Sequence, residues 1–327
     1  MRKTSNAEAK IEEILDYEKS RYSRKGYGLI MAILATLGWF LILPKLIERI
    51  WPYKILNEGV VFCLSSYFVH MASFIAFNIV MWVIYNLEWP FFERYKVLDR
   101  PWPWNEDQEK WRIMLKKTIL LLFVNQVIIL PFFLLNDYLT NHSPYRLDLE
   151  SFPSTFEIIW QTTIFMLCED FFFYWCHRFL HWDKIYPYIH KVHHQYVYSI
   201  SIASEYSHPV DYFLTAICAS LAPLALGRRV HLVTYLLWVV LRTAETTDGH
   251  CGYEFSWSPF RLLPMSGSSE FHQFHHFVFK GNYSSFFTYW DRLCGTVSKK
   301  YIDYVEKKND IIGKQESQFK NLKEKQN

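Results

Sequence analysis

Charged side chains are scarce in this chain of 327 residues. Asp, Glu, Lys and Arg make up 20% of the sequence, below the roughly 25% that is usual for soluble domains. Hydrophobic residues reach 51% and are gathered into long runs, which favours a membrane protein over a soluble one. The net charge of +3 is too small to indicate a protein that binds nucleic acid.

Cysteine pairs and a secretory signal are also missing. None of the six Cys residues forms a C-x-x-C pair with another, which argues against a thiolate metal motif and favours reduced, packed thiols. The first 25 residues contain five acidic residues and no apolar core, unlike a signal peptide. We therefore expect residues 1–27 to form a charged cytosolic arm.

Six apolar runs dominate the rest of the sequence. They cover residues 28–47, 60–87, 118–135, 156–175, 212–226 and 232–241. The first four approach or exceed the ~20 residues of a membrane-spanning helix, so we expect about four transmembrane helices. The last two are short, and Gly227, Arg228 and Arg229 join them. We expect a re-entrant or interfacial hairpin there, with a pair of short spans as the alternative.

The distribution of Lys and Arg predicts how the chain is oriented in the membrane. Seven of them precede the first run, seven lie in residues 88–117, three lie in residues 44–59 and one lies in residues 136–155. The positive-inside rule therefore places the N-terminus and the 88–117 loop in the cytosol. After four crossings, the region that follows residue 175 is expected to be cytosolic as well.

Histidine is concentrated in three clusters. The 13 His residues include two H-x-x-H-H motifs, whereas chance would give roughly 0.02 in a chain of this length. The clusters are His177 and His181; His190, His193 and His194; and His272, His275 and His276. Residues at i, i+3 and i+4 share one face of a helix, so we expect each cluster to aim its imidazoles in one direction.

Eight imidazoles exceed what a single metal ion uses. A structural zinc takes four protein ligands, and a catalytic zinc takes three and a water. Neutral imidazole binds Fe, Zn and Cu, and eight to ten His can hold two ions with a position left open for oxygen. We therefore expect a two-metal centre of the redox type. His208 and His250 lie between the second and third clusters and are further candidate ligands.

Four acidic residues are candidates to orient these ligands. A metal-bound His usually donates its other N–H to a carboxylate or a carbonyl. Asp170 lies seven residues before His177, on the same helical face, and Glu169 lies beside it. The alternative for this acidic pair is an interfacial charge pair with Lys or Arg. Glu205 and Asp248 are further candidates.

Several stretches around the histidines carry a resemblance. They are Glu169-Asp170, Tyr174-Trp175, the first two histidine clusters, Ser204 to Pro209, His250 to Phe255, and parts of Gly281 to Thr296. The earlier stretches resemble the sterol desaturase and fatty acid hydroxylase superfamily. The later ones resemble, within it, the C-4 methylsterol monooxygenases. The resemblance covers roughly residues 155 to 300.

The resemblance implies a non-haem di-iron enzyme of the endoplasmic reticulum membrane, with its active site facing the cytosol. Such an enzyme uses O2 and electrons relayed from NAD(P)H through cytochrome b5 or a similar carrier, and the methylsterol branch oxidises a C-4 methyl group of a sterol. The eight histidines of the three clusters carry over as iron ligands, with no catalytic residue beyond the metal centre. Lys323 and Lys325 also resemble a dilysine retrieval signal of this compartment.

The resemblance leaves alternatives open. The third cluster commonly reads H-D-x-H-H in this superfamily, and Gln273 stands in place of the acid. A sterol desaturase, a sterol side-chain oxidase or a fatty acid hydroxylase with the same centre therefore remains an alternative. A zinc-dependent membrane hydrolase could use the same histidines, although no H-E-x-x-H motif supplies its general base. A non-catalytic membrane scaffold is the third reading.

Together these observations predict an all-α, polytopic membrane protein with a cytosolic helical cap that carries a histidine-rich di-metal site. We expect a cytosolic arm at 1–27, transmembrane helices 1–3 at 28–154, a fatty acid hydroxylase-like catalytic domain at 155–300, and a flexible tail at 301–327. The tail is rich in Lys, Glu and Gln, a composition that does not support a packed core. The expected partners are a sterol or other lipid substrate, the bilayer and the electron carrier.

Overall fold

The computed structural model describes residues 25–51, 57–98, 100–140 and 142–310, with residues 129–140 as backbone only. Within these residues the chain is all α-helical, as expected, and its extended segments form isolated bridges rather than strands. Most of the expected N-terminal arm and the end of the tail, with Lys323 and Lys325, lie outside the described residues.

Eight helices form the main body. In chain order they are α2 (Lys25–Leu37), α3 (Leu43–Ile50), α4 (Glu58–Leu87), α7 (Gln108–Thr140), α8 (Thr155–Leu180), α9 (Pro209–Leu226), α10 (Leu232–His250) and α11 (Ser269–Val278). Short helical turns lie between them: the π-helical η1 (Gly38–Ile42), α5 (Pro90–Glu93), α6 (Pro103–Glu106), η2 (Leu149–Ser151), η3 (His190–Gln195), η4 (Ser201–Glu205), η5 (Gly227–Arg229) and η6 (Pro259–Leu262). One more short helix, α12 (Tyr289–Leu293), follows α11.

Polar side chains fix where the helices that carry the histidines begin. The Ser154 hydroxyl accepts the N–H of Glu157 at the start of α8, and Ser268 does the same for Phe271 at the start of α11. His231 accepts the N–H of Val233 and so starts α10. A side chain that accepts one of the free N–H groups of a first turn stabilises the helix by about 1 kcal/mol.

Three segments of the described residues are long and apolar enough to cross a membrane. They are Gly26–Ile50, Glu58–Leu87 and Pro209–Arg229, so this is a multi-pass membrane protein. The first two are the first two expected spans. The third is the first arm of the expected hairpin, and it is longer than its apolar run because Pro209 begins the helix three residues earlier.

The third and fourth expected spans have a different outcome. Residues 118–135 lie within α7, and residues 156–175 lie within α8. Residues 129–135 of the third expected span are described as backbone only, so this span is not tested. α8 is described throughout and is not among the three candidate spans. α8 carries Glu169 and Asp170 buried in its second half, and these charged groups reduce its mean hydropathy. The third expected span therefore stays a prediction, whereas the fourth, in α8, is not a candidate span and α9 is one.

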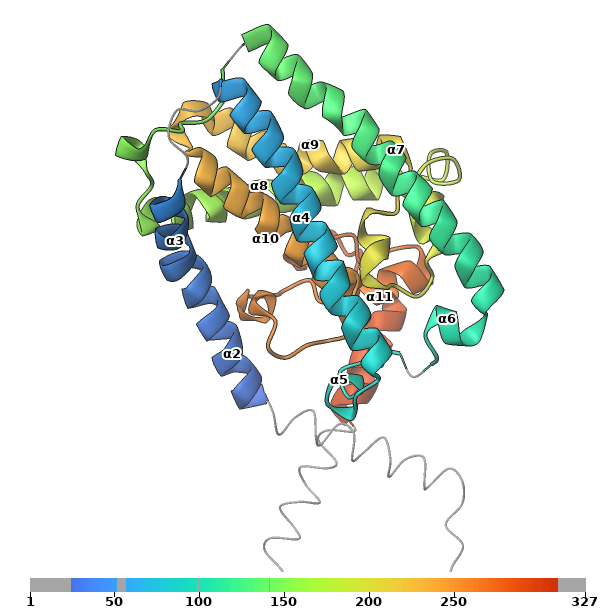
Figure 1. Cartoon of the computed structure of the whole chain (residues 1–327). Coiled ribbons are helices and arrows are strands. Elements are labelled where there is room, and N and C mark those ends of the chain that lie inside the picture. Colours follow the sequence, from blue (N-terminus) through green and yellow to red (C-terminus); the bar gives the residue numbers. More distant parts are fainter. Residues whose placement is uncertain (1–24, 52–56, 99, 141, 311–327) are drawn as a thin grey trace, which may run out of the picture.

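The helices that carry the site pack on one another through aromatic side chains. α8 lies along α9, and α10 contacts both α4 and α11 (Figure 1). Trp238 of α10 is buried between Phe165 of α8 and Phe286. α9 and α10 are joined by the short turn η5, and the ends of both helices away from η5 lie beside the histidines, as the next section shows. The chain therefore leaves the site along α9 and returns to it along α10.

Candidate metal centre

Nine of the ten candidate histidine ligands converge in space. They come from the end of α8, from η3, from the end of α10 and from α11. Five of them form one group, the first cluster: His177, His181, His190, His194 and His275. The other four form the second cluster: His193, His250, His272 and His276. Within each cluster the donor nitrogens lie within 4.8 Å of one another.

The sequence clusters do not coincide with the spatial ones. His193 and His194 are neighbours in η3 but belong to different clusters, and so do His275 and His276 in α11. Adjacent residues point about 100° apart on an α-helix and about 120° apart on a 3₁₀-helix. The expectation that each sequence cluster aims its imidazoles in one direction was therefore wrong for the second and third sequence clusters. In each of them, two adjacent imidazoles belong to different spatial clusters.

The Nδ1 atoms of six rings are held by hydrogen-bond acceptors. In five rings Nδ1–H donates to a backbone carbonyl: His177 to Tyr283 (2.8 Å), His193 to Tyr206 (3.0 Å), His250 to Thr246 (2.7 Å), His275 to Gly281 (2.8 Å) and His276 to Tyr196 (2.9 Å). In the sixth, His190 donates to the Asp211 carboxylate at 2.7 Å. Because Nδ1 carries the proton in each ring, Nε2 is left bare and available as a ligand.

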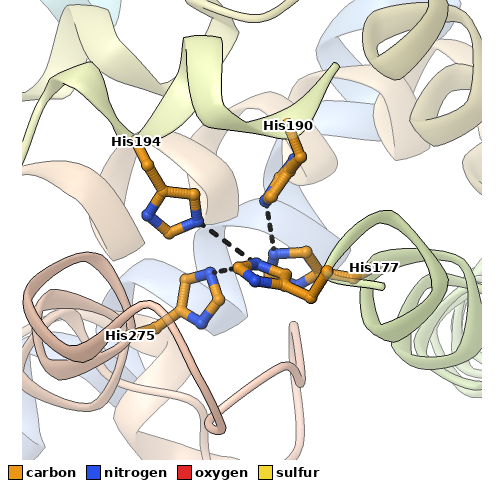
Figure 2. Close-up of side chains that lie close together, drawn as sticks. His177, His190, His194 and His275 are labelled. Atoms are coloured by element: carbon orange, nitrogen blue, oxygen red, sulfur yellow. Dashed lines mark hydrogen bonds between the residues drawn. The ribbon is translucent and has the colours of Figure 1, made fainter. Parts of the chain in front are cut away.

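The bare Nε2 atoms face one another. His177 and His190 approach to 3.0 Å in the first cluster, and His193 and His250 approach to 3.2 Å in the second. Figure 2 shows rings of the first cluster pointing towards a common centre. Two lone pairs at this distance repel each other unless a cation lies between them. Ligands about 2.1 Å from one ion, at right angles, are about 3 Å apart, so the donor set fits a bound metal ion.

Burial keeps these imidazoles neutral. Burial and the neighbouring His190 lower the pKa of His193 to about 4. Burial and nearby imidazoles also hold the pKa values of His194, His272 and His276 well below the usual range. Metal ions bind the neutral ring, so at neutral pH the protein does not have to remove protons from these ligands.

His208 stays apart from the two clusters. Its Nδ1 accepts the N–H of Val210 and so caps the start of α9, where Pro209 occupies the first turn. The side chain therefore has a local role in helix formation. His250, the other candidate between the sequence clusters, lies in the second spatial cluster.

The four candidate orienting carboxylates contact other groups. Glu169 pairs with Arg242 at 2.8 Å, and Asp248 pairs with Arg261 at 2.7 Å. Asp170 accepts the N–H of Phe287 at 3.0 Å, and Glu205 lies 3.3 Å from His70. None of these bonds reaches a histidine of either cluster. The charge pair considered as the alternative for Glu169 is the one that the structure contains.

Asp211 is the orienting carboxylate that the sequence did not reveal. It is 2% exposed and lies in the first turn of α9. An acidic residue is common in the first turn of any helix because it interacts favourably with the helix dipole. It also lies 21 residues after His190, a separation that predicts no shared face, so no local pattern indicated the contact.

Gln273, which stands where an acid is usual, joins two segments of the site. Its side-chain oxygen accepts the N–H of Ser199, and its amide donates to the carbonyl of Val197, both at 2.9 Å. A carboxylate could accept the first bond but could not donate the second. The amide therefore ties the segment after η3 to α11.

One chamber opens onto both clusters. It has a volume of about 230 Å³ and is lined by five of the nine histidines, namely His177, His190, His193, His250 and His272. Its other walls include the apolar side chains of Phe173, Trp238 and Val239. A molecule in this chamber would contact both clusters at once in surroundings that are mostly apolar.

Comparisons with known proteins agree with this geometry. The fatty acid hydroxylase family model matches residues 162–296. The methylsterol monooxygenase erg25A of Aspergillus fumigatus is 34% identical over 77% of this chain and 84% of its own length. Methylsterol monooxygenase 1 of Gallus gallus is 34% identical over 74% of this chain and 78% of its own. The very-long-chain aldehyde decarbonylase GL1-11 of Oryza sativa subsp. indica is 43% identical over 42% of this chain and 53% of its own. No solved structure gives a significant match.

Proposed function

The chain belongs to the fatty acid hydroxylase superfamily, and we propose that it is a di-iron monooxygenase that oxidises a C-4 methyl group of a methylsterol. Two relatives that align along most of the chain bear the name methylsterol monooxygenase. The proposal includes O2 as co-substrate, electrons from NAD(P)H through cytochrome b5 or a similar carrier, and the endoplasmic reticulum as the compartment. The oxidoreductase class itself follows from the family and the histidine clusters.

The observation that carries the proposal is the shared chamber. Histidines of both clusters line it, so two ions bound there would face the same substrate. We propose the nine histidines of the two clusters as the ligands. Iron at these positions supplies the one-electron and O2 chemistry that amino-acid side chains lack.

The chain's own residues orient the ligands and shield the reaction. Backbone carbonyls and Asp211 hold the rings so that Nε2 faces the centre. Apolar walls such as Trp238 and Val239 limit the access of water, which protects a reactive centre from side reactions. The unactivated C–H group of a sterol methyl would lie against these walls without polar partners.

A second candidate substrate is a long-chain aldehyde. The rice relative named as an aldehyde decarbonylase is 43% identical to this chain, compared with 34% for the two methylsterol monooxygenases, but over a shorter aligned region. Since that region is only 42% of this chain, the relatives that cover more of it favour the sterol. Both candidates are apolar molecules that a membrane enzyme would take from the bilayer.

The test is expression of the full chain in a sterol-requiring fungal host that lacks its own methylsterol oxidase. We expect growth without added sterol and loss of 4-methyl intermediates in the sterol profile measured by mass spectrometry. The double variant His193→Ala, His275→Ala removes one ligand from each cluster. Cells that make this variant should again require added sterol and accumulate 4-methyl intermediates. Unchanged sterols in cells that make the protein would refute the methylsterol assignment, and consumption of long-chain aldehydes would favour the second candidate.

Metal analysis of the purified protein separates the oxygenase from the hydrolase. We expect about two iron ions per chain and oxygen consumption that depends on a reductant. Zinc together with turnover that needs no oxygen would support the hydrolase instead. A single ion per chain would contradict the two-metal centre.

A further inference from the structure

A second cavity lies against the chamber. It is an apolar groove of about 460 Å³ lined by α4 and α7, two helices that contact each other and are labelled in Figure 1. Its walls include Ile75 and Ile79 of α4 and Phe123 of α7, and all three side chains are at least half exposed. Because α4 is a candidate membrane span, this groove faces the bilayer.

Three residues line both the groove and the chamber. They are Tyr67, Gln126 and Glu205, so the two cavities meet at these side chains. The groove supplies the larger volume, and the chamber, at about 230 Å³, is smaller than the 300–1,000 Å³ of a typical site for a whole ligand. A sterol-sized molecule would therefore place one end in the chamber and the rest of its body in the groove.

Four polar side chains from four different elements meet at this junction. This junction cluster consists of His70 on α4, Gln126 on α7, Glu205 on η4 and Tyr212 on α9. His70 Nε2 lies 3.2 Å from the Tyr212 hydroxyl and 3.3 Å from Glu205 Oε1. The Gln126 amide donates to the Tyr212 hydroxyl at 2.9 Å.

Two acceptor atoms of the junction cluster lack a donor. Glu205 Oε2 and Gln126 Oε1 are buried without a hydrogen-bond partner, on side chains that are 6% and 5% exposed. A buried acceptor left unpaired costs about 1–3 kcal/mol. Since both atoms are acceptors, the ligand group that fits there is one that donates a hydrogen bond to one of them.

The junction cluster lies close to the metal ligands. Tyr206, the residue after Glu205, holds His193 through its carbonyl. Asp211, the residue before Tyr212, holds His190 through its carboxylate. A group bound at the junction would therefore place the adjoining part of the same molecule beside histidines of both clusters.

We propose that the junction cluster binds the hydroxyl group of a lipid alcohol whose body lies in the groove between α4 and α7. The inference rests on the proposed function for its substrate class. In a 4-methylsterol the hydroxyl-bearing carbon, C-3, is bonded to C-4. Binding the 3-hydroxyl at the junction would thus put the C-4 methyl group just inside the chamber.

The test compares the binding of three ligands by the full, metal-loaded chain in nanodiscs, without reductant. The ligands are a 4,4-dimethylsterol, its 3-methyl ether and its 3-ketone, which share one ring system, while only the alcohol can donate a hydrogen bond. We expect the alcohol to bind at least about tenfold more tightly than either analogue, since one lost hydrogen bond at a buried site is worth about 1.4 kcal/mol or more.

Two variants test the two acceptors separately. Glu205→Gln places an amide where a carboxylate oxygen was, and Gln126→Leu removes the other acceptor. A hydroxyl has one proton, so the variant that removes the acceptor it uses should reduce the preference for the alcohol to less than about threefold. Asn78→Leu is the matched control, because Asn78 is another amide that lines the groove but does not line the chamber. It should keep the preference of the unmodified chain.

The result that overturns the inference is equal binding of the alcohol and its ether by the unmodified chain, or an unchanged preference in both junction variants. Failure to bind the alcohol at all overturns it too. The outcome is separable from that of the proposed function, because binding is measured without turnover. A chain that prefers the alcohol but oxidises no sterol would contradict the proposed function alone, and one that oxidises sterols without this preference would contradict the junction alone.

Discussion

The role of each histidine is decided by the partner of its Nδ1 atom. A ring whose Nδ1–H donates to an oxygen atom presents a bare Nε2 atom. Six rings of the two clusters have an Nδ1 atom held in this way. Five of these partners are backbone carbonyls, so side-chain substitution cannot remove them. Asp211 is the exception, and it offers a direct test of ligand orientation.

We expect Asp211→Asn to weaken metal binding or activity by about 10- to 100-fold, the usual effect of losing a residue that orients a metal ligand. The amide oxygen can still accept from His190, but the negative charge that strengthens the bond is lost. Metal content by mass spectrometry and sterol turnover measure the effect. Asp183→Asn is the control, because Asp183 is exposed and pairs at 3.5 Å with the exposed Lys280. Equal metal content in both variants would contradict the orienting role.

Two histidines that look alike in the sequence should behave differently. His250→Ala removes one of the four donors of the second cluster, and we expect about one of the two ions to be lost. His208→Ala removes a helix cap, so we expect full metal content and a loss of stability of about 1 kcal/mol. Metal analysis and thermal unfolding of the two purified variants distinguish these outcomes. Loss of metal in His208→Ala would show that the ligand set is incomplete.

At the scale of elements, the turn after α11 shapes the first cluster. Gly281 has a φ of +87°, and a Cβ atom there would lie 2.5 Å from the carbonyl oxygen of Thr296. The same residue supplies the carbonyl that holds His275. The backbone conformation of one turn therefore sets the orientation of one ligand.

We expect Gly281→Ala to lower the free energy of unfolding by more than about 1 kcal/mol and to lower metal content, because the turn must move to admit the methyl group. Gly295→Ala is the control that separates the steric clash of the new methyl group from backbone strain. Gly295 also has a positive φ, +63°, but has open space around it. The control variant should lose stability but keep its metal. The measurements are thermal unfolding and metal content, and equal metal loss in both variants would contradict the link between the Gly281 carbonyl and His275.

Hydropathy and histidine spacing predicted much of the molecule but not its internal contacts. The helical fold, the first two spans and the convergence of nine histidines were all expected. Two metal sites were expected, but the assignment of each histidine to one of them was not, because it depends on the angle between adjacent residues such as His193 and His194. A span in α9 was expected only as the alternative to the hairpin, because the apolar run 212–226 is shorter than the helix, which begins at Pro209.

At the scale of the whole molecule, the two clusters join elements that lie far apart in the sequence. α8 and η3 contribute from one side, and α10 and α11 contribute from residues 250 to 276. Each ion bound there would add a further link between these elements, beside packing and polar contacts such as the Glu169–Arg242 pair of α8 and α10. The metal should therefore stabilise the fold as well as serve the reaction.

We expect the metal-loaded protein to unfold at a higher temperature than the same protein after chelation, because a ligand that binds only the folded state stabilises it. The gain is about 2.7 kcal/mol per site when free metal is 100 times its Kd. Thermal unfolding in nanodiscs, with and without a chelator, measures the difference. The His193→Ala, His275→Ala variant is the control and should show a much smaller shift, since each cluster has lost a donor. An identical change of unfolding temperature in the control would mean that the chelator acts elsewhere. No change in the unmodified chain would show that the repulsion between the facing Nε2 atoms is relieved without an ion.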